Sequence, residues 1–398
     1  MELRTFLILV LWSPCLYFAQ SGCTDPQATN YNPSALINDG SCNYPNSNYG
    51  LNWVANLSDT LQENSGLIRL GNFLYTFNDS GAGTYLYEMD TNGILIRTLT
   101  VQGATNVDWE AISANSSHVF IGDMGNNAGN RVDLCIYRIP IQEMVQDTVQ
   151  AEKMVFYWED QTVFASQPNA NNYDCEAFFA REDSLVLFSK NWTDLKTRRY
   201  SLPTFWSDTL SATCIDSFNI DGLITDACYD ASLNEAYLLG YKNNGSNFYT
   251  SFIWCLWDFP NHHYFGGNKR RIEIGNVLNV SQTEGITLSA NHQGFVSSEK
   301  VVSIITLAPK LFRFQFNSYF ESLAEIPTPS SDLPFQIITQ NGNEWHEIYI
   351  SGNFSSPSLC DLQGRDLCFL RTANTLKTFH HGIALLTLGT KTTLLYLP

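Results

Sequence analysis

The chain has 398 residues, of which 22 are Lys or Arg and 39 are Asp or Glu, so its formal net charge at pH 7 is −17. A chain of this length can bury a large core and should hold two or three folded units, which argues against disorder. Its only basic run is Lys269–Arg271, and this argues against nucleic acid as a partner, because phosphate backbones require a Lys and Arg footprint.

Residues 1–20 have the pattern of a secretory signal peptide. Arg4 gives a weakly positive start, and the apolar run from Phe6 to Trp12 is too short to span a bilayer. We expect cleavage near Gln20; a lipoprotein acylated at Cys23 is the alternative. No later stretch reaches the roughly 18 apolar residues of a membrane helix, so we expect no membrane span after cleavage.

Residues 21–45 form a segment bounded by cysteines and rich in turn-forming residues. The stretch Gly22–Cys42 resembles the short module GCTDPxAxNYNPxAxxDDGSC of exported proteins of the Bacteroidetes phylum. A segment this small cannot supply its own core, so we expect a Cys23–Cys42 disulfide, worth about 3 kcal/mol by loop entropy. Four residues of the segment carry side-chain oxygens that either bind calcium or only cap turns: Asp25, Asn30, Asn32 and Asp39. We expect most of the other cysteines to be small buried hydrophobic residues.

From Tyr49 to about Phe316 the chain alternates apolar and polar residues with a period of two, which predicts strands. Five short phrases align with one another: Ser65–Leu67, Glu110–Ile112, Glu176–Phe178, Asp226–Cys228 and Glu284–Ile286. Each phrase is followed by a second and a third strand, and the first four also by a fourth. Because Asn52–Asn56 stands in front of the first phrase, we expect it to supply the missing strand of the fifth unit.

This repeat predicts an all-β chain with a five-bladed β-propeller over residues 49–320. A propeller of six blades, with an extra blade within Gln142–Gln167, and a tandem β-sandwich are the alternatives. The middle residue of every phrase is small, as the crowded inner strand near the axis requires: Gly66, Ala111, Ala177, Ala227 and Gly285.

In a propeller blade the innermost strand begins, and the second strand ends, on the same face of the disc. The strand starts, together with one second-strand end, therefore predict a calcium site at the channel mouth: Glu110, Glu176, Asp226, Glu284 and Asp123. The other second-strand ends predict ligand-binding residues: Asp79, Lys190, Asn191, Tyr241, Glu299 and Lys300. Carboxylates facing one channel repel unless calcium, a basic ligand, a lysine or protonation intervenes. The alternative is that each acid accepts hydrogen bonds from backbone N–H groups of the neighbouring blade.

The phrases Thr283–Ile286 and Asp108–Ile112 resemble those of esterase-like phytase propellers and related extracellular propellers. Our first hypothesis is a calcium-stabilised binding or adhesion module that recognises a glycan or a protein on its acidic face. The second is a metal-dependent, esterase- or phosphatase-like hydrolase, in which Glu110, Glu176 and Glu284 hold the ion and Lys190 steadies an anionic substrate. In the third hypothesis, the channel acids have only a structural role. Serine-hydrolase, zincin and phosphate-loop motifs are missing from the sequence.

A linker rich in Pro and Ser over residues 326–334 precedes a second predicted domain at residues 335–398. This domain contains Cys360–Arg365, Gly382–Leu386 and Lys391, and it resembles the C-terminal sorting domain of type IX secretion cargo, with Ala384 where that family has Tyr. The resemblance implies a small β-sandwich, the type IX secretion machinery as a partner, and a protein that is secreted or attached to the outer surface. An ordinary accessory β domain is the alternative.

Overall fold

The computed structural model describes residues 20–245, 248–303 and 305–320, and beyond these only Leu367 and the C-terminal strands given below. The chain divides into two compact units, Met1–Leu323 and Ala324–Pro398. Nearly all of the predicted signal peptide and the whole predicted linker at residues 326–334 lie outside the described residues.

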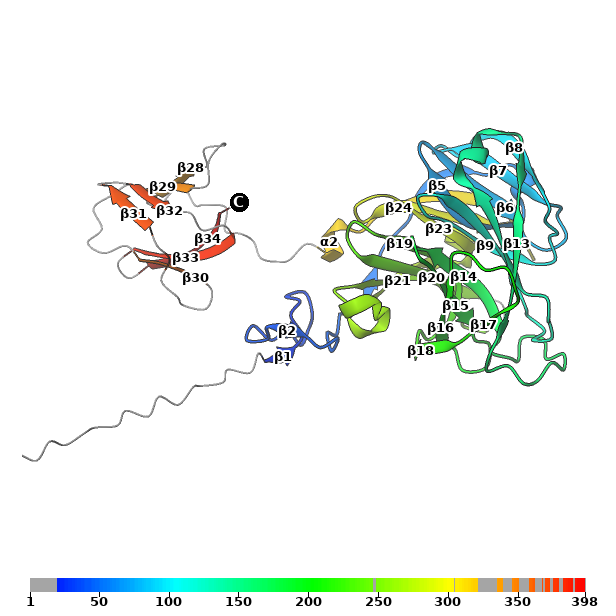
Figure 1. Cartoon of the computed structure of the whole chain (residues 1–398), viewed down its shortest axis with the longest axis horizontal. Helices are drawn as coiled ribbons and strands as arrows, with labels where there is room; N and C mark the ends of the chain where they lie inside the picture. Colours follow the sequence, from blue (N-terminus) through cyan, green and yellow to red (C-terminus); the bar gives the residue numbers. More distant parts are fainter. Residues whose placement is uncertain are drawn as a thin grey trace, which may run out of the picture. The chain divides into compact units, whose positions relative to one another are not determined.

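The first unit contains five antiparallel sheets that follow one another along the chain as the blades of a propeller (Figure 1). Blade 1 consists of β5 (Asn64–Leu70), β6 (Phe73–Asn78), β7 (Tyr85–Asp90) and β8 (Leu95–Gln102). Blade 2 consists of β9 (Trp109–Ala114), β10 (His118–Asp123), β11 (Cys135–Pro140) and β13 (Glu152–Trp158). Blade 3 consists of β14 (Asp174–Ala180), β15 (Ser184–Lys190), β16 (Thr197–Pro203) and β18 (Cys214–Phe218).

Blade 4 consists of β19 (Leu223–Asp230), β20 (Glu235–Asn243), β21 (Tyr249–Trp257) and β22 (Asn268–Asn276). Blade 5 consists of β23 (Gln282–Ala290), β24 (Gln293–Glu299), β27 (Lys310–Gln315) and β4 (Asn52–Asn56). The fourth strand of blade 5 therefore comes from the other end of the propeller sequence. It pairs antiparallel with β27, so that Asn56 lies opposite Lys310 and Asn52 opposite Arg313. The predicted closure of the ring by Asn52–Asn56 is confirmed.

Three blades carry a short additional strand at their outer edge, each paired in parallel: β12 (Thr148–Gln150) on β8, β17 (Leu210–Ala212) on β13, and β3 (Ser47–Asn48) on β22. These strands cover edges that would otherwise expose unpaired backbone groups. The segment Gln142–Gln167 is shared between the 3-10 helix η2 (Ile141–Val145), β12 and β13. Because these elements belong to blades 1 and 2, the described residues contain no sixth blade.

The remaining elements of the first unit are short. They are β1 (Ser21–Gly22), β2 (Ile37–Asn38), η1 (Asp59–Leu61), η3 (Pro260–His262), η4 (Tyr264–Gly266), α1 (Val277–Val280), β25 (Val301–Val302), β26 (Thr306–Leu307) and α2 (Asn317–Phe320). Among the described helices, none has the length and apolar character needed to cross a membrane.

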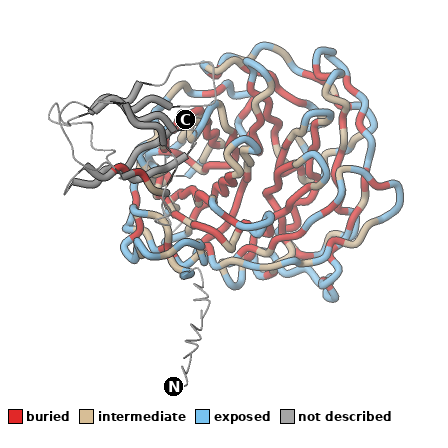
Figure 2. The backbone as a smooth tube through the Cα atoms, turned by 60° about the vertical axis from the view of Figure 1, so that its left-hand side comes forward, coloured by how far each residue is buried: buried red, intermediate tan, exposed pale blue. Residues whose placement is uncertain are grey.

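The hydrophobic core lies between neighbouring blades. The cluster between blades 2 and 3 contains fully buried Phe156 and Phe178 together with Trp158, and Figure 2 shows buried backbone through the interior of the sheets with exposed backbone in the connecting loops. At the axis the inner strands approach closely: a Cβ added to Gly285 would lie 2.8 Å from the Leu67 Cβ and 3.0 Å from the Gly66 carbonyl carbon. The small residues in the middle of the repeated phrases are therefore required by the packing of the inner strands.

The second unit contains two small antiparallel sheets. One consists of β28 (Phe335–Ile338), β29 (His346–Ile350), β32 (Thr375–Thr378) and β31 (Phe369–Thr372), in this order. The other consists of β30 (Ser358–Asp361), β33 (Gly382–Leu388) and β34 (Lys391–Leu397). A small all-β domain thus follows the propeller in sequence, as predicted.

We predict that Gly285→Ala lowers the free energy of unfolding by about 1–3 kcal/mol, because the new methyl group would overpack the axis. Gly50→Ala is the matched control, since a Cβ at Gly50 would meet no atom within 4 Å. Denaturant unfolding of both variants measures the difference. Equal stability of the two variants would contradict the crowding of the axis.

Candidate functional site

Three of the predicted acids occupy a special backbone position on the inner strands. Glu110, Glu176 and Glu284 each lie at a β-bulge, where the register with the second strand shifts and the acid has no cross-strand partner. A bulge turns a side chain out of the regular alternation of the strand. The three glutamates therefore leave the blade interior, and Glu176 lies close enough to both others to interact with them electrostatically.

Asp226 differs from these glutamates although it stands at the same place in the repeat. In blade 4 the bulge residue is Thr225, and Asp226 keeps a partner in the ladder. Its two carboxylate oxygens accept hydrogen bonds from the backbone N–H groups of Ala227 (2.8 Å) and Ile286 (2.7 Å). Asp226 is fully buried and joins the inner strands of blades 4 and 5, which is the structural role that the sequence left open.

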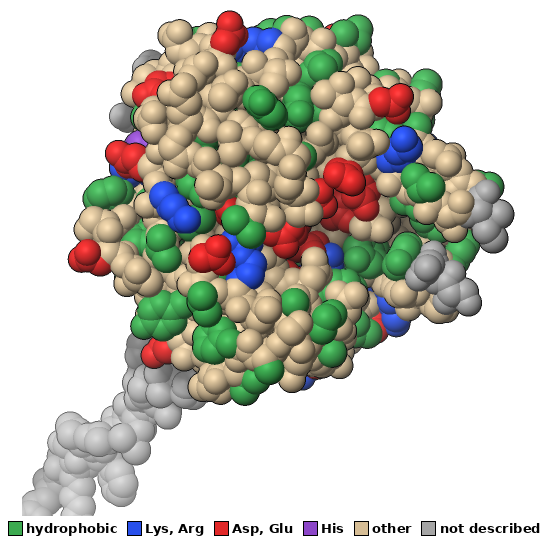
Figure 3. All heavy atoms as spheres, turned by 90° about the vertical axis from the view of Figure 1, so that its right-hand side faces the viewer, with side chains coloured by type: hydrophobic (Ala, Val, Ile, Leu, Met, Phe, Trp, Pro, Cys, Tyr) green, Lys and Arg blue, Asp and Glu red, His purple; other side chains and the backbone are tan. Residues whose placement is uncertain are grey.

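Eight carboxylates that interact electrostatically with one another make up what we call the mouth cluster. Its members are Glu63, Asp79, Asp108, Glu110, Asp174, Glu176, Glu284 and Glu299. Figure 3 shows one face of the molecule on which acidic side chains gather in a hollow. Within the cluster, Asp108 Oδ2 and Glu110 Oε1 are close neighbours, since each lies 2.3 Å from the position that a Cβ of Gly125 would occupy.

Lys190 is the buried cation of this cluster. Its ammonium group forms an ion pair with Glu176 and lies over the rings of Trp192 (5.0 Å to the centroid) and Tyr241 (5.2 Å). Burial lowers the pKa of Lys190, but Glu176, Tyr241 and the neighbouring carboxylates together outweigh this effect and hold the pKa well above its ordinary value. Lys190 is thus a charged ammonium group between an acid and two aromatic rings, an arrangement that favours cations.

Lys190 alone does not neutralise the eight acids, and several of them have raised pKa values. Burial, reinforced by the neighbouring carboxylates, raises the pKa of Asp108 to about 6, of Asp79 to about 7 and of Glu299 to about 9. The same causes raise the pKa of Glu110 well above its ordinary value. Glu110 is 6% exposed, and among the described residues its carboxylate has no hydrogen-bond donor. The cluster therefore holds acids that take up protons, or another positive charge, near neutral pH.

Three other predicted residues have structural partners. Asp123 is buried, pairs with Arg131 (2.8 Å) and accepts a hydrogen bond from the Asp108 N–H (3.0 Å). Asn191 is buried between two side chains, accepting from Ser189 Oγ (2.6 Å) and donating to Asp194 Oδ1 (2.9 Å). Lys300 is half-buried, and its backbone N–H donates to the Gln62 carbonyl (2.7 Å).

Asp108 and Asp174 belong to the mouth cluster although neither was predicted as a site residue. Asp174 is fully buried and accepts hydrogen bonds from the Asn126 N–H (2.7 Å) and from Trp192 Nε1 (2.8 Å). Both residues stand two positions before a predicted glutamate, in the pattern Asp-x-Glu of blades 2 and 3. That shared pattern was the available signal, because it recurs at the same place in two blades.

The five predicted calcium ligands fit an ion poorly. Asp226 and Asp123 have their oxygens engaged as described, and within the described parts of the chain no three His, Cys, Asp or Glu side chains are placed to hold a metal ion. No chemical step through a metal is derived for this site. The calcium site stays a prediction.

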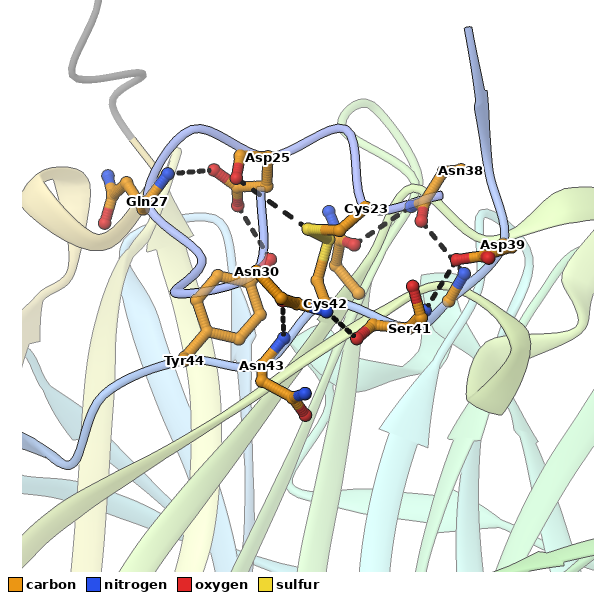
Figure 4. The surroundings of a disulfide bond; sticks show 12 residues. Cys23, Asp25, Gln27, Asn30, Asn38, Asp39, Ser41, Cys42, Asn43 and Tyr44 are labelled. Atoms are coloured by element: carbon orange, nitrogen blue, oxygen red, sulfur yellow. Dashed lines mark hydrogen bonds between the residues drawn. A yellow bond between two sulfur atoms is a disulfide. The ribbon is translucent and has the colours of Figure 1, made fainter. Parts of the chain in front are cut away.

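The Cys-bounded module has the predicted disulfide between Cys23 and Cys42 (Figure 4). Its four candidate calcium ligands all accept backbone hydrogen bonds within the module. Asp25 accepts from the Gln27 N–H (2.8 Å), Asn30 from Asn43 (2.8 Å), Asn32 from Ser34 (3.0 Å) and Asp39 from Ser41 (3.0 Å). These contacts support the turn-capping alternative.

The module also docks on the propeller. Asn38 Nδ2 donates to Asp258 Oδ2 (2.7 Å) and to Asn268 Oδ1 (2.9 Å), and Lys269 Nζ donates to the Gly40 carbonyl (3.0 Å). The Tyr44 ring packs on Trp257 at a centroid distance of 5.3 Å. Asn38, which replaces the Asp usual in such modules, is therefore one of the residues that hold the module on blade 4.

No protein-family model and no curated protein matches the chain. Solved structures are similar to it at low identity. A GH43 β-1,3-galactosidase with galactodeoxynojirimycin is 10% identical, with 66% of this chain and 94% of that chain covered and a TM-score of 0.40. An α-L-arabinanase of Penicillium chrysogenum complexed with arabinobiose is 9% identical, with 77% and 94% covered and a TM-score of 0.36. An auxiliary nutrient binding protein of Bacteroides thetaiotaomicron is 11% identical, with 68% and 78% covered and a TM-score of 0.30. The five-bladed fold follows from the strand pairing described above, independently of these similarities.

We predict that the melting temperature falls as the pH rises from 5 to 9. The raised pKa values of Asp108, Asp79 and Glu299 mean that the folded chain binds more protons than the unfolded chain in this range. The resulting stability is fully present below the unfolded-state pKa values and is lost as the pH passes the folded-state values. Calorimetry across this range measures the slope.

Two variants separate the mouth cluster from the structural acids. Glu110→Gln should raise the melting temperature at pH 8 and flatten its dependence on pH, because it removes a buried charge without a hydrogen-bond donor. Asp226→Asn should lower the melting temperature at every pH, since one backbone N–H loses its acceptor, at a cost of about 1–3 kcal/mol. A Glu110→Gln variant with the same slope as the unaltered chain would contradict this account.

Proposed function

We propose that this chain is an exported β-propeller binding module, and that the mouth cluster is its ligand site. The observation that carries the proposal is the excess of buried carboxylates over Lys190, the one buried lysine in the described part of the chain. Structural acids, such as Asp226, have their oxygens satisfied by backbone N–H groups. Glu110 and Asp108 face each other without such donors, and clusters of acids with perturbed pKa values are typical of functional sites.

The ligand that fits this site carries an alkylammonium group, and we propose a basic protein segment. Lys190 supports this choice, because it shows how the mouth accommodates an ammonium group between Glu176 and the rings of Trp192 and Tyr241. Burial and the repulsion between neighbouring carboxylates raise the pKa values of Asp108 and Glu110, and a second ammonium group beside them would offset both effects. A phosphate or another anion would add to the repulsion, which is why the hydrolase hypothesis is not carried forward.

Calcium is the inorganic alternative for the same positive charge. Hard cations prefer oxygen ligands, and the cluster offers carboxylates in excess. Against it stands the poor fit of the predicted ligand set described above. We therefore propose the organic cation, and calcium enters the experiment as the competing outcome.

The test is calorimetric titration of the mature chain with a tri-lysine peptide at low ionic strength. We expect binding that weakens at least about tenfold in Glu110→Gln, because close interfacial charge pairs contribute 1.5 kcal/mol or more. Binding should also weaken as the pH falls from 8 to 5, since protonation of Asp79 and Asp108 removes the attracting charge.

Two controls make the titration specific. The same peptide with acetylated lysines should not bind, because acetylation removes the charge. Glu152 lies outside the mouth cluster and pairs with Arg138. Glu152→Gln therefore removes one acid away from the site and should leave the affinity unchanged. If the peptide does not bind, or if calcium raises the melting temperature of the unaltered chain and not that of Glu110→Gln, the basic-segment proposal fails.

We further propose that residues 335–398 direct the chain through the type IX secretion system. The three sorting-like motifs support this proposal, because they fall on strands of one sheet: Asp361 on β30, Gly382 on β33 and Lys391 on β34, which pair in this order. The signal-peptide pattern at residues 1–20 and the Cys-bounded module agree with export.

Deletion of residues 335–398 tests the address. In a host with a type IX system we expect the full chain on the cell surface or in the medium, and the truncated chain retained in the periplasm, as measured by fractionation and immunoblotting. Secreted propeller in equal amounts from both chains would show that this domain is an accessory β domain.

A further inference from the structure

A second candidate site lies away from the mouth cluster, on the outer part of blade 4. A cavity of about 920 Å³ lies between the ends of β20, β21 and β22 and the connector from β3 to β4. A neighbouring cavity of about 430 Å³ shares Asn46, Asn48, Arg271 and Glu273 with it and extends toward Tyr44 and Trp254. We call the two together the rim groove. No member of the mouth cluster lines either cavity.

The charged side chains of the rim groove are engaged with one another or with the backbone. Lys242 Nζ pairs with Asp221 Oδ2 (2.6 Å), and Arg271 Nε pairs with Glu273 Oε1 (2.6 Å). The Arg271 guanidinium also donates to the Ile220 carbonyl (2.6 Å) and lies over the Phe252 ring at 3.7 Å. The groove therefore offers little unpaired charge to a ligand, in contrast to the mouth.

Amide side chains dominate what remains, and two of them are held in fixed orientations. Asn244 Nδ2 donates to Thr250 Oγ1 (2.8 Å), which leaves its Oδ1 as an acceptor. Asn276 Oδ1 accepts from the Leu278 N–H (3.0 Å), which leaves its Nδ2 as a donor. Asn276 lies directly opposite Thr250 in the ladder of β21 and β22. An acceptor just after β20 and a donor at the end of β22 thus lie on either side of β21 in blade 4.

β3 and the residue before it supply the opposite wall with further amides. Asn46 and Asn48 are exposed, and among the described residues their side-chain atoms have no hydrogen-bond partner. The half-buried rings of Tyr44 and Trp254 line the far end of the groove. The free amide of Asn46 or Asn48 carries a donor beside an acceptor, which matches the vicinal hydroxyl groups of a sugar, and aromatic rings pack on its apolar face.

We propose that the rim groove binds a neutral oligosaccharide chain. Its first cavity has the size of typical ligand pockets, which range from about 300 to 1,000 Å³. The paired charges disfavour a charged ligand, whose desolvation they would not repay. The groove runs over two connected cavities, so it suits a chain of sugars better than a single ring. This site is independent of the mouth, and the protein would hold a neutral glycan and a basic segment at different places.

Affinity electrophoresis of the mature chain tests the proposal. The probes are soluble neutral polysaccharides, namely arabinoxylan, mixed-linkage β-glucan, galactomannan, arabinan and galactan, with polygalacturonate as the charged comparison. We expect at least one neutral polysaccharide to retard the chain, and both Asn244→Ala and Asn48→Ala to reduce this retardation at least about tenfold in apparent affinity, since each removes hydrogen bonds to the ligand.

Two variants serve as controls. Asn130→Ala removes an exposed amide outside the groove and should leave the retardation unchanged. Glu110→Gln should also leave it unchanged, which separates this site from the mouth cluster. Melting temperatures of all variants show that they are folded.

Three results would overturn the proposal. These are no retardation by any neutral polysaccharide of the panel, retardation by polygalacturonate alone, and retardation by a neutral polysaccharide that survives both groove variants. Loss of binding in Glu110→Gln together with unaltered binding in Asn244→Ala would assign the glycan to the mouth instead.

Discussion

The structure depends on the close approach of five inner strands around one axis. At the axis there is little room even for a Cβ, as the contacts around Gly285 and Gly66 show. Each inner strand also has to satisfy its backbone N–H groups, and Asp226 does so between blades 4 and 5. The ring can close only if a fourth strand is supplied to blade 5, and β4 supplies it. The closed ring of five blades therefore imposes both the crowding of the inner strands at the axis and the pairing of β4 with β27 in blade 5.

The fold also tolerates a group of buried carboxylates, the mouth cluster, next to the closely packed inner strands. Bulges in three inner strands direct Glu110, Glu176 and Glu284 out of the ladders and toward one another. Burial of these acids in their charged form opposes folding, because a buried carboxylate loses its hydration and becomes more stable when protonated. Lys190 offsets part of this cost through its pair with Glu176. The negative charge that Lys190 leaves uncompensated is the physical reason to look for function in the mouth cluster rather than at Asp226.

Much of the fold could be predicted from the sequence, because the alternation of apolar residues and the repeated phrases report strand order directly. The closing strand Asn52–Asn56 was found by its position alone. The acidic residue types of the mouth cluster could be predicted from the sequence, but the way in which their side chains are arranged could be predicted only in part. Nothing in the alternation distinguishes Glu110, which lies at a bulge, from Asp226, which lies one place after a bulge. Glu176 and Lys190 lie on the consecutive strands β14 and β15, but the bulge that brings their side chains together has no signal in the alternation. The rim groove arises where β22 meets β3, which is distant in sequence.

The closing strand has a consequence for the order of events during biosynthesis. β4 is among the first propeller segments to leave the ribosome, and its partner β27 is the last strand of the propeller to do so. Contacts between such distant parts of a chain form late and slowly, because a long loop has to be ordered first. The ring therefore cannot close before Lys310–Gln315 has been synthesised, and until then the outer edge of blade 5 has no partner.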